Sequence, residues 1–311
     1  MRPKVVITNW IHPEVMEFLQ PHCVVVANST REPWSQETII EHAKDAVGLM
    51  TFMPDSVDNI FLERCSKLRV IACALKGYDN FDVEACTRRG VWLTIVPDLL
   101  TVPAAELAVG LLISLARHVS TGDGFVRSGA FKGWRPLLYG AGLAGSVVGV
   151  LGLGAIGRAI MTRLRCFDCR ALIYYDKRAL DTDDERALGV RRVSFQELLR
   201  ESDFLIVAVP MTDETKHQIS ADALRAMKPG GYLLNIARGS VVDEQAVAEA
   251  LAQGRLAGYA ADVFEMEDWT RPDRPRLIPR ELLAQSEKTL FTPHLGSAVH
   301  RVRVAIEMAA A

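Results

Sequence analysis

The chain has 311 residues, of which 49% are hydrophobic and 24% charged, and its formal net charge at pH 7 is -2. This length suits two domains of ordinary size, and the composition is that of a folded globular protein. A pI near 6.4 excludes the strongly basic surface that binds nucleic acid.

The first residues, Met-Arg-Pro-Lys-Val-Val-Ile-Thr, predict a short buried strand and lack the long apolar segment of a signal peptide. No later apolar run approaches the length of a membrane span, so we expect a cytoplasmic protein. The six cysteines are scattered through apolar segments, which predicts free thiols. Cys166 and Cys169 have the spacing of a zinc or redox pair, but no second pair completes such a site, and we expect no metal.

The first hundred residues alternate short apolar runs with amphipathic stretches, the pattern of a parallel sheet covered by helices. Residues 104–119 predict a long, largely apolar helix that suits a connector between two domains. A glycine-rich irregular loop over 129–145 follows it and carries Trp134 and Tyr139. The strands predicted before these segments cover 5–8, 23–27, 46–52, 70–74 and 91–96.

A glycine motif, Gly152-Leu-Gly154-Ala-Ile-Gly157, directly follows the apolar run 147–151, and Asp176 closes the next apolar run. An acidic residue about 20 residues beyond the glycines is the spacing of a dinucleotide-binding fold. Gly152 permits the tight turn, Gly154 lets the backbone approach a pyrophosphate, and Gly157 lets helix and strand pack closely. The free amides of the next helix suit phosphate binding. The motif therefore predicts a nicotinamide cofactor.

Asp176 also predicts which cofactor is preferred. Its carboxylate is expected to accept hydrogen bonds from the adenosine ribose hydroxyls and to repel a 2′-phosphate, which favours NAD. The cations Lys177 and Arg178 follow it directly and would offset part of that repulsion. We therefore expect NAD to be preferred and NADP to be tolerated to a measurable degree.

Strands and helices continue to alternate to the end of the chain. In open parallel sheets, ligands bind beyond the carboxyl ends of the strands, so residues just after strands are candidates for chemistry. The later strands are predicted at 171–175, 203–209, 232–236, 258–263 and 289–292, and the later helices at 159–164, 221–227, 244–253 and 302–311. The residues selected in this way are Lys76, Asp98, Arg238, Glu267 and His294.

Three of these residues together suggest catalysis. The planar guanidinium of Arg238 can grip two oxygens of a carboxylate or phosphorus oxyanion, although a surface arginine that only caps structure stays an alternative. Histidine is the side chain best suited to proton transfer near neutral pH, which makes His294 a candidate. A carboxylate such as Glu267, bonded to one imidazole nitrogen, would fix the tautomer and leave the other nitrogen as the base. Taken singly, a histidine or glutamate is more often structural.

The segments Arg238-Gly-Ser-Val-Val-Asp243, Asp262-Val-Phe-Glu-Met-Glu267 and Thr292-Pro-His-Leu-Gly-Ser297, in this order after the glycine motif, resemble the D-isomer-specific 2-hydroxyacid dehydrogenase family along essentially the whole chain. The resemblance implies two doubly wound α/β domains with parallel sheets. A Rossmann domain over 100–292 would bind NAD, and a flavodoxin-like domain from 1–99 and 293–311 would bind substrate. It also implies a cleft between the domains and a homodimer.

One loop departs from the general family pattern. Family members usually carry small or aliphatic residues before Gly-x-Asp, whereas this chain has Ala74-Leu-Lys76-Gly-Tyr-Asp79. With the segments 52–55, 97–101, 133–139 and 259–269, this loop resembles the family members that oxidise phosphite. Phosphite is compact and largely dianionic, so two cations, Lys76 and Arg238, would supply most of its binding.

The resemblance implies a role for further residues. Met53 and Trp134 are read equally well as packing residues, and Arg303 as either a source of positive potential at the rim or a surface residue. Arg238, Glu267 and His294 are the expected catalytic residues. The expected substrate-binding residues are Lys76, Gly77, Arg238, Met53, Leu100, Trp134, Tyr139 and Ser297. The expected cofactor-binding residues are Gly152, Gly154, Ala155, Ile156, Gly157, Asp176, Pro210, Thr215, Ala237, Asp262 and Gly296.

The expected reaction is NAD-dependent oxidation of phosphite to phosphate. Water activated by His294 and Glu267 would attack phosphorus as hydride leaves for the nicotinamide. An alternative with the same fold and residues acts on a small 2-hydroxy or 2-keto acid, for which Lys76 would bind a carboxylate. A third possibility is a nucleotide-sensing corepressor without turnover, because fold does not determine function.

Overall fold

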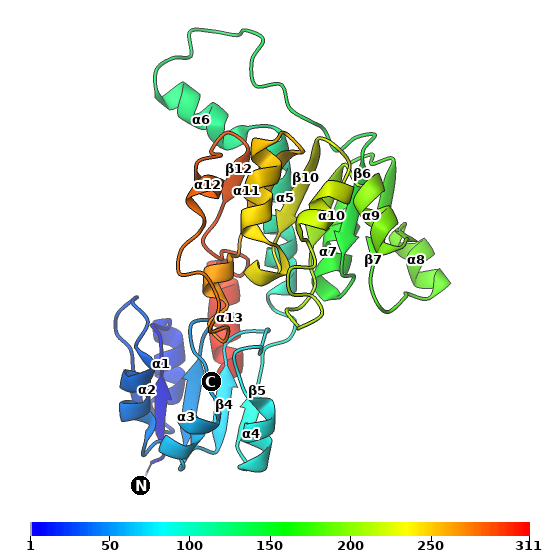
Figure 1. Cartoon of the computed structure of the whole chain (residues 1–311). Helices are drawn as coiled ribbons and strands as arrows, with labels where there is room; N and C mark the ends of the chain where they lie inside the picture. The colour runs from blue at the N-terminus through cyan, green and yellow to red at the C-terminus, as the bar shows by residue number, and fades with distance from the viewer. Residues whose placement is uncertain (1) are drawn as a thin grey trace. The chain divides into compact units, whose positions relative to one another are not determined.

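The computed structural model describes residues 2–311 and divides the chain into two compact units. Unit 1 contains the chain up to Leu100, Trp269–Asp273 and Ser297–Ala311, and unit 2 contains Thr101–Asp268 and Arg274–Gly296. Each unit holds one parallel sheet with helices on both faces (Figure 1). The predicted fold class is thus confirmed.

The sheet of unit 1 has the strand order β2-β1-β3-β4-β5, the flavodoxin-like order. One face buries apolar side chains of α2, α3 and α4, and the other buries those of α1 and α13. The strands are β1 (Lys4–Ile7), β2 (Val24–Ala27), β3 (Gly48–Thr51), β4 (Val70–Cys73) and β5 (Trp92–Thr94). The helices are α1 (Pro13–Leu19), α2 (Gln36–Ala43), α3 (Asn59–Arg64), α4 (Val83–Arg88) and α13 (His300–Ala310).

The sheet of unit 2 has the order β12-β11-β10-β9-β6-β7-β8, and every strand pair is parallel. Read from β8, this is the dinucleotide-binding order with one strand added, and the order reverses between β6 and β9. The strands are β6 (Val147–Leu151), β7 (Ala171–Tyr175), β8 (Arg191–Arg192), β9 (Phe204–Val207), β10 (Gly231–Asn235), β11 (Leu256–Ala261) and β12 (Thr289–Phe291).

Alternate side chains of these strands face opposite sides of the sheet and meet different helices. Val148 and Val150 pack with α5 and α7, whereas Val147 and Leu151 pack with α9, α10, α11 and α12. The helices of unit 2 are α5 (Thr101–Ala116), α6 (Val119–Arg127), α7 (Ala155–Leu164), α8 (Thr182–Leu188), α9 (Phe195–Glu201), α10 (Ala221–Ala226), α11 (Glu244–Ala252) and α12 (Arg280–Leu283), with 3₁₀ turns η1 (Gly239–Val241) and η2 (Glu265–Glu267).

The helix predicted over 104–119 differs from the structure. The helix α5 begins at Thr101 and ends at Ala116, and His118 then adopts a left-handed conformation with φ 53° before α6 begins. Apolar packing supports α5, which buries nine of its residues, but α6 buries none. The helix α6 and the loop after it project away from the sheet of unit 2 (Figure 1).

No single helix within residues 2–311 meets the length and hydropathy needed to span a membrane, and only α5 and α6 taken together as a bent pair do so. The cysteines are unpaired, with Cys166 exposed and Cys169 half-buried. Among residues 2–311, no group of three or more His, Cys, Asp or Glu side chains is arranged to hold a metal.

Candidate functional site

The glycine motif forms the turn between β6 and α7, at the carboxyl end of the central strand of unit 2. Gly152 has φ +94°, and a Cβ there would lie 2.7 Å from the carbonyl oxygen of Ala208, so only glycine fits. A Cβ on Gly157 would lie 2.2 Å from the carbonyl oxygen of Gly152. Because glycine has no Cβ, α7 can pack this close to the turn. At Gly154 a Cβ would meet no atom within 4 Å.

This turn fits a dinucleotide. The space above Gly154 lies at the first turn of α7, where the backbone amides are not capped by a side chain, and a pyrophosphate can approach them. Asp176 follows β7 and accepts hydrogen bonds from the amides of Leu153 (2.8 Å) and Arg178 (3.0 Å). Its carboxylate is therefore oriented by the same turn. Lys177 forms an ion pair with Glu214.

The other predicted cofactor residues also lie at the carboxyl ends of strands in unit 2. The side chain of Thr215 is held within its own loop, since its hydroxyl donates to the carbonyl oxygen of Pro210 (2.7 Å) and accepts from the amide of Thr212 (2.8 Å). Ala155 and Ile156 begin α7, Ala237 follows β10, and Gly296 lies in the segment after β12.

Glu267 and His294 come from different turns and form a hydrogen-bonded pair. Nδ1 of His294 donates to Oε2 of Glu267 at 2.7 Å. The other carboxylate oxygen, Oε1, accepts from the amide of Phe264 at 2.8 Å, which orients Glu267. Nε2 of His294 has no hydrogen-bond partner within residues 2–311. This geometry leaves Nε2 as a proton acceptor and places a carboxylate behind the imidazole, as predicted.

Asp262 anchors the segment that carries His294. Its Oδ1 accepts from the hydroxyl of Thr292 (2.6 Å) and the amide of Leu295 (2.7 Å), and its Oδ2 accepts from the amide of Gly296 (2.8 Å). The carboxylate is 2% exposed, and this burial raises its pKa above the ordinary value. His294 itself has φ 56°, a left-handed conformation that these bonds help to hold.

Arg238 lies in the turn between β10 and η1. The buried side chain of Asn235 holds this turn at two points, because its amide nitrogen donates to the carbonyl oxygen of Arg238 (2.9 Å) and its oxygen accepts from the amide of Ala237 (3.0 Å). A Cβ on Gly239 would lie 1.9 Å from the carbonyl carbon of Phe264. The Arg238 turn is therefore packed directly on the backbone that leads to Glu267.

In unit 1, Lys76 follows β4 on a loop held at both sides. The amide of Ala74 donates to Thr51 (2.9 Å), and the amide of Val96 donates to the carbonyl oxygen of Leu75 (2.9 Å). Arg303 of α13 lies beside this loop, with Nη1 donating to the carbonyl oxygen of Ala74 at 3.5 Å. The loop that carries Lys76 therefore has a second cation beside it, at Ala74.

Arg303 is held by a buried carboxylate that sequence analysis did not identify. Its Nη2 donates to Oε1 of Glu307 at 3.4 Å, and Glu307 is 2% exposed. His12 donates to Oε2 of Glu307 from its amide (3.0 Å) and from Nδ1 (2.8 Å). Burial lowers the pKa of Arg303, although a guanidinium stays charged at any physiological pH.

The remaining predicted substrate residues are placed as follows. Met53 lies after β3, where its carbonyl oxygen accepts from Asn80 (2.9 Å). Gly77, Leu100 and Ser297 are partly buried residues of unit 1. Trp134 and Tyr139 lie on the loop after α6 in unit 2 and are 86% and 80% exposed. Their role beside a substrate stays a prediction.

The comparisons with known proteins agree with these observations. The family described as "D-isomer specific 2-hydroxyacid dehydrogenase, NAD binding domain" matches residues 109–296. The chain belongs to this family. As a member of it, the chain carries the family's NAD-binding domain in unit 2, and the predicted nicotinamide cofactor is confirmed at the level of NAD(P).

Similar proteins have names that describe them as reductases of glyoxylate. A glyoxylate reductase of Pyrococcus furiosus is 39% identical, over 98% of this chain and 89% of the relative, and one from Thermococcus litoralis is 36% identical, over 97% and 90%. The NADPH-dependent glyoxylate/hydroxypyruvate reductase of Sinorhizobium meliloti, solved with NADP and malonate, has a TM-score of 0.85 and 30% identity, over 100% and 92%. These names support the predicted alternative better than they support phosphite.

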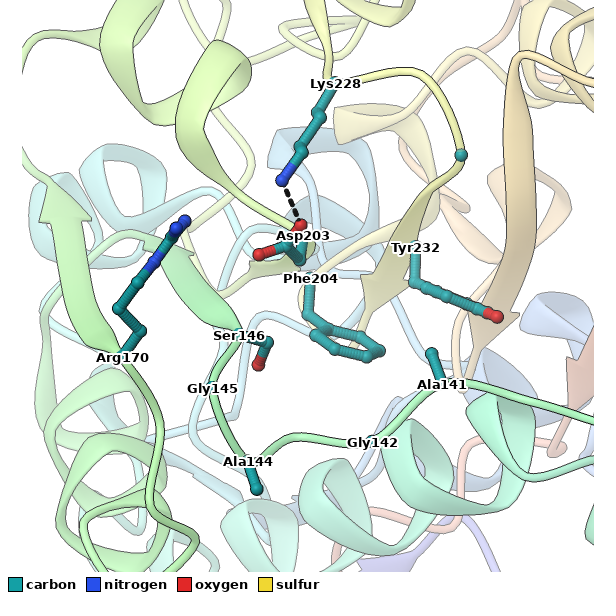
Figure 2. A pocket seen from close by; sticks show the side chains of 11 residues that line it. Ala141, Gly142, Ala144, Gly145, Ser146, Arg170, Asp203, Phe204, Lys228 and Tyr232 are labelled. Atoms are coloured by element: carbon teal, nitrogen blue, oxygen red, sulfur yellow. Dashed lines mark hydrogen bonds and ion pairs between the residues drawn. The ribbon is translucent and has the colours of Figure 1, made fainter.

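A separate cavity of about 330 Å³ lies at the opposite edge of the sheet of this dehydrogenase, at the amino ends of β6, β9 and β10 (Figure 2). Asp203 occupies its wall, where the carboxylate accepts from Lys228 and from the amide of Val147 (2.8 Å). Because the cofactor turn is at the carboxyl ends of the strands, this cavity is not the candidate active site.

Proposed function

We propose that this chain is an NAD-dependent oxidoreductase that acts on a small oxyanion, with phosphite as the substrate. The observation that carries the proposal is the pair of cations in unit 1, where Lys76 follows β4 and Arg303 contacts the same loop. Lys76 occupies a position at which the family usually has a small or aliphatic residue. A dianion such as phosphite gains more from added positive charge than a monocarboxylate does.

In the proposed reaction, the guanidinium of Arg238 and the ammonium of Lys76 bind the oxygens of one phosphite, and Arg303 adds positive potential. NAD, when bound, supplies the acceptor for a hydride. Nε2 of His294 takes a proton from water as the water oxygen bonds to phosphorus and the P–H bond breaks. Glu267 stabilises the imidazolium that results. The products are phosphate, reduced cofactor and one proton.

A second candidate uses the same groups on a small 2-keto acid, and the names of the relatives favour it. Arg238 and Lys76 would bind the carboxylate. Protonated His294 would donate its proton to the carbonyl oxygen as hydride arrives, and the product would be a 2-hydroxy acid. Glyoxylate and hydroxypyruvate are the appropriate test substrates.

One experiment separates these candidates. Purified protein is incubated with NAD and phosphite, and with NADH or NADPH and either glyoxylate or hydroxypyruvate, while absorbance at the nicotinamide band and inorganic phosphate are followed. We expect kcat/KM for phosphite to exceed that for either keto acid by about 100-fold or more. The reverse order would establish the second candidate, and bound cofactor without turnover of any substrate would support a sensor.

We also propose that the dehydrogenase forms a homodimer through the segment from α6 to residue 140. This segment exposes large apolar side chains, among them Val126 (56%), Phe131 (48%) and Trp134 (86%). A projecting apolar segment of this size is unfavourable in water, and a second copy presents the same segment for a symmetric contact. Light scattering should give a molar mass twice the chain mass of 34.3 kDa. The double substitution Val126→Asp and Phe131→Asp should lower this molar mass toward that of a single chain.

A further inference from the structure

Unit 2 buries a second group of acids behind the pair of Glu267 and His294. Glu244, the first residue of α11, is 1% exposed, Glu265 is 6% exposed and Asp268 is 4% exposed. The proposed reaction uses none of these three. Carboxylates that are removed from water are costly unless they are paired or protonated, so their arrangement calls for an explanation.

Glu244 and Glu265 bind each other's backbone. The amide of Glu265 donates to Oε1 of Glu244 at 2.7 Å, and the amide of Glu244 donates to Oε1 of Glu265 at 3.3 Å. Oε2 of Glu265 accepts from Nε2 of His217 at 2.8 Å. The amide of His217 donates to the carbonyl oxygen of Ser240 (2.7 Å), and the amide of Ser240 donates to Oδ2 of Asp268 (2.8 Å). These bonds form a ring through three segments of the chain.

Two of the three segments carry the proposed chemistry. Arg238 directly precedes Gly239 and Ser240, and Glu267 lies between Glu265 and Asp268. The absence of a side chain at Gly239 lets the two turns touch through their backbones. The ring therefore holds the turn that follows Arg238 against the turn that carries Glu267.

Four carboxyl groups lie at this ring, and Arg274 approaches one of them, Asp268. Glu265, Asp268 and Glu267 face Glu244 from the η2 turn, Tyr259 faces it from β11, and His217 reaches it through Glu265. Oε2 of Glu244 is buried without a hydrogen-bond partner within residues 2–311. Burial, followed by the nearby carboxylates, raises the pKa of Glu244 to about 8. Glu244 is therefore neutral at pH 7 and gains a charge just above it.

We propose that Glu244 is a positioning residue, which in its neutral form holds the Arg238 turn against the Glu267 turn and on deprotonation loosens that contact. Neutral Glu244 accepts the bond from the amide of Glu265 without repelling the neighbouring carboxylates. Ionised Glu244 adds a buried charge that repels Glu265, Asp268 and Glu267, and separation of the two turns relieves this repulsion. Binding of an anion by Arg238 should weaken accordingly on the alkaline side.

The first test is the pH dependence of catalysis, and for this readout alone the proposal rests on the proposed function. KM and kcat are measured from pH 6 to pH 10 for wild type, for Glu244→Gln and for Glu249→Gln, an exposed glutamate on the same helix as the control. We expect the wild-type KM for the anionic substrate to rise about tenfold between pH 7 and pH 9.5. In Glu244→Gln this rise should be absent or begin at least about one pH unit higher, whereas Glu249→Gln should follow wild type.

The second test needs no substrate. The folded chain keeps the Glu244 proton to about pH 8, whereas the unfolded chain releases it near the ordinary value. Stability from this group is therefore complete below about pH 4.5 and is lost as the pH rises to about 8. The melting temperature of Glu244→Gln should fall less than that of wild type between pH 6 and pH 9. Glu265→Gln removes one of the facing charges and so lowers the pKa of Glu244, so its melting temperature should also fall less than that of wild type between pH 6 and pH 9.

Equal pH dependence of wild type and Glu244→Gln in both measurements would overturn the proposal. A flatter melting curve with an unchanged KM profile would also overturn it, because Glu244 would then affect stability but not Arg238. If neither phosphite nor a keto acid is turned over, the proposed function fails. The melting comparison still decides whether Glu244 loses its proton in the folded chain. The dissociation constant of phosphite, measured from the change in intrinsic fluorescence as phosphite is added, then replaces KM.

Discussion

At the scale of single residues, the chemistry depends on side chains that other groups hold in one orientation. Both oxygens of Glu267 are engaged, one by Nδ1 of His294 and one by the amide of Phe264. The imidazole therefore keeps the tautomer with a free Nε2, and in the proposed reaction the positive charge that develops on it would lie beside a carboxylate. In unit 1, the loop of Lys76 is fixed through the backbones of Ala74 and Leu75.

Substitution Glu267→Gln tests the orienting carboxylate. The amide keeps the size of the side chain but removes the charge that stabilises the imidazolium, so we expect kcat to fall about 100-fold. KM for the anion should change little, because Glu267 does not bind it. Steady-state kinetics at saturating NAD measure both constants. A fall in kcat of less than about threefold would contradict the assigned role.

Substitution Lys76→Ala tests the anion site. Loss of a charge-assisted contact worth about 1.5–3 kcal/mol should raise KM for the oxyanion about tenfold or more. Lys67→Ala, at an exposed lysine of the same unit, is the matched control and should behave as wild type. Initial rates over a range of substrate concentrations provide the measurement. An unchanged KM in Lys76→Ala would show that this cation does not bind the substrate.

At the scale of elements, the candidate functional residues lie where strands end and turns begin. The β6–α7 turn needs glycine for two different reasons, since Gly157 is enclosed by backbone atoms whereas Gly154 faces open space. The loop after β12 is held by Asp262, and the turn after β10 by Asn235. Each turn is thus fixed by a buried polar side chain at a strand end: Asp262 follows the neighbouring strand β11, and Asn235 is the last residue of β10 itself.

The two glycines make a matched pair for testing the cofactor site. Gly157→Ala places a Cβ 2.2 Å from the carbonyl oxygen of Gly152 and should cost about 1–3 kcal/mol of stability. Gly154→Ala meets no protein atom, so it should melt near wild type while the dissociation constant of NADH rises about tenfold. Thermal unfolding and fluorescence titration give the two values. Unweakened NADH binding by Gly154→Ala would exclude close approach of the pyrophosphate there.

At the scale of the whole molecule, stability depends on buried carboxyl groups in both units. Asp55 of unit 1 is 4% exposed and accepts hydrogen bonds from Thr8 and from the amide of Phe52 (2.7 Å). Burial outweighs these bonds and raises the pKa of Asp55 to about 6, while in unit 2 it raises that of Glu244 to about 8. Each group keeps its proton to higher pH in the folded chain than in the unfolded chain, so stability is lost as the pH rises to about 6 for Asp55 and to about 8 for Glu244.

Substitution Asp55→Asn tests this dependence in unit 1. The folded chain keeps the proton to about pH 6, whereas the unfolded chain loses it near the ordinary value, so the contribution of Asp55 is complete below about pH 4. Roughly 3 kcal/mol is lost as the pH rises to about 6. The melting temperature of Asp55→Asn should therefore fall less than that of wild type over this range, and exposed Glu41→Gln is the control. Parallel melting curves would show that folding does not raise the pKa of Asp55.

The sequence by itself determined the features that depend on local pattern. The strand predicted at 147–151 is confirmed as β6 (Val147–Leu151), because a continuous apolar run before a glycine turn has few alternative structures. The pairing of His294 with Glu267 was predicted from their positions after strands, and the structure places the two at hydrogen-bonding distance. The residues of parallel strand ends meet at one edge of a sheet, so this inference needs only the fold class.

The tertiary structure decided which polar residues are buried together. Nothing in the sequence distinguishes Glu244 and Glu265 from surface glutamates at the start of a helix or turn, nor Glu307 from an exposed residue of an amphipathic helix. The break at His118 was likewise missed, since the apolar pattern continues into Val119 while the packing that supports α5 ends at Ala116. Whether a charged side chain is buried, and which other charges lie near it, depends on contacts between residues distant in sequence. The periodicity of apolar residues describes only neighbours along the chain, so it does not predict these contacts.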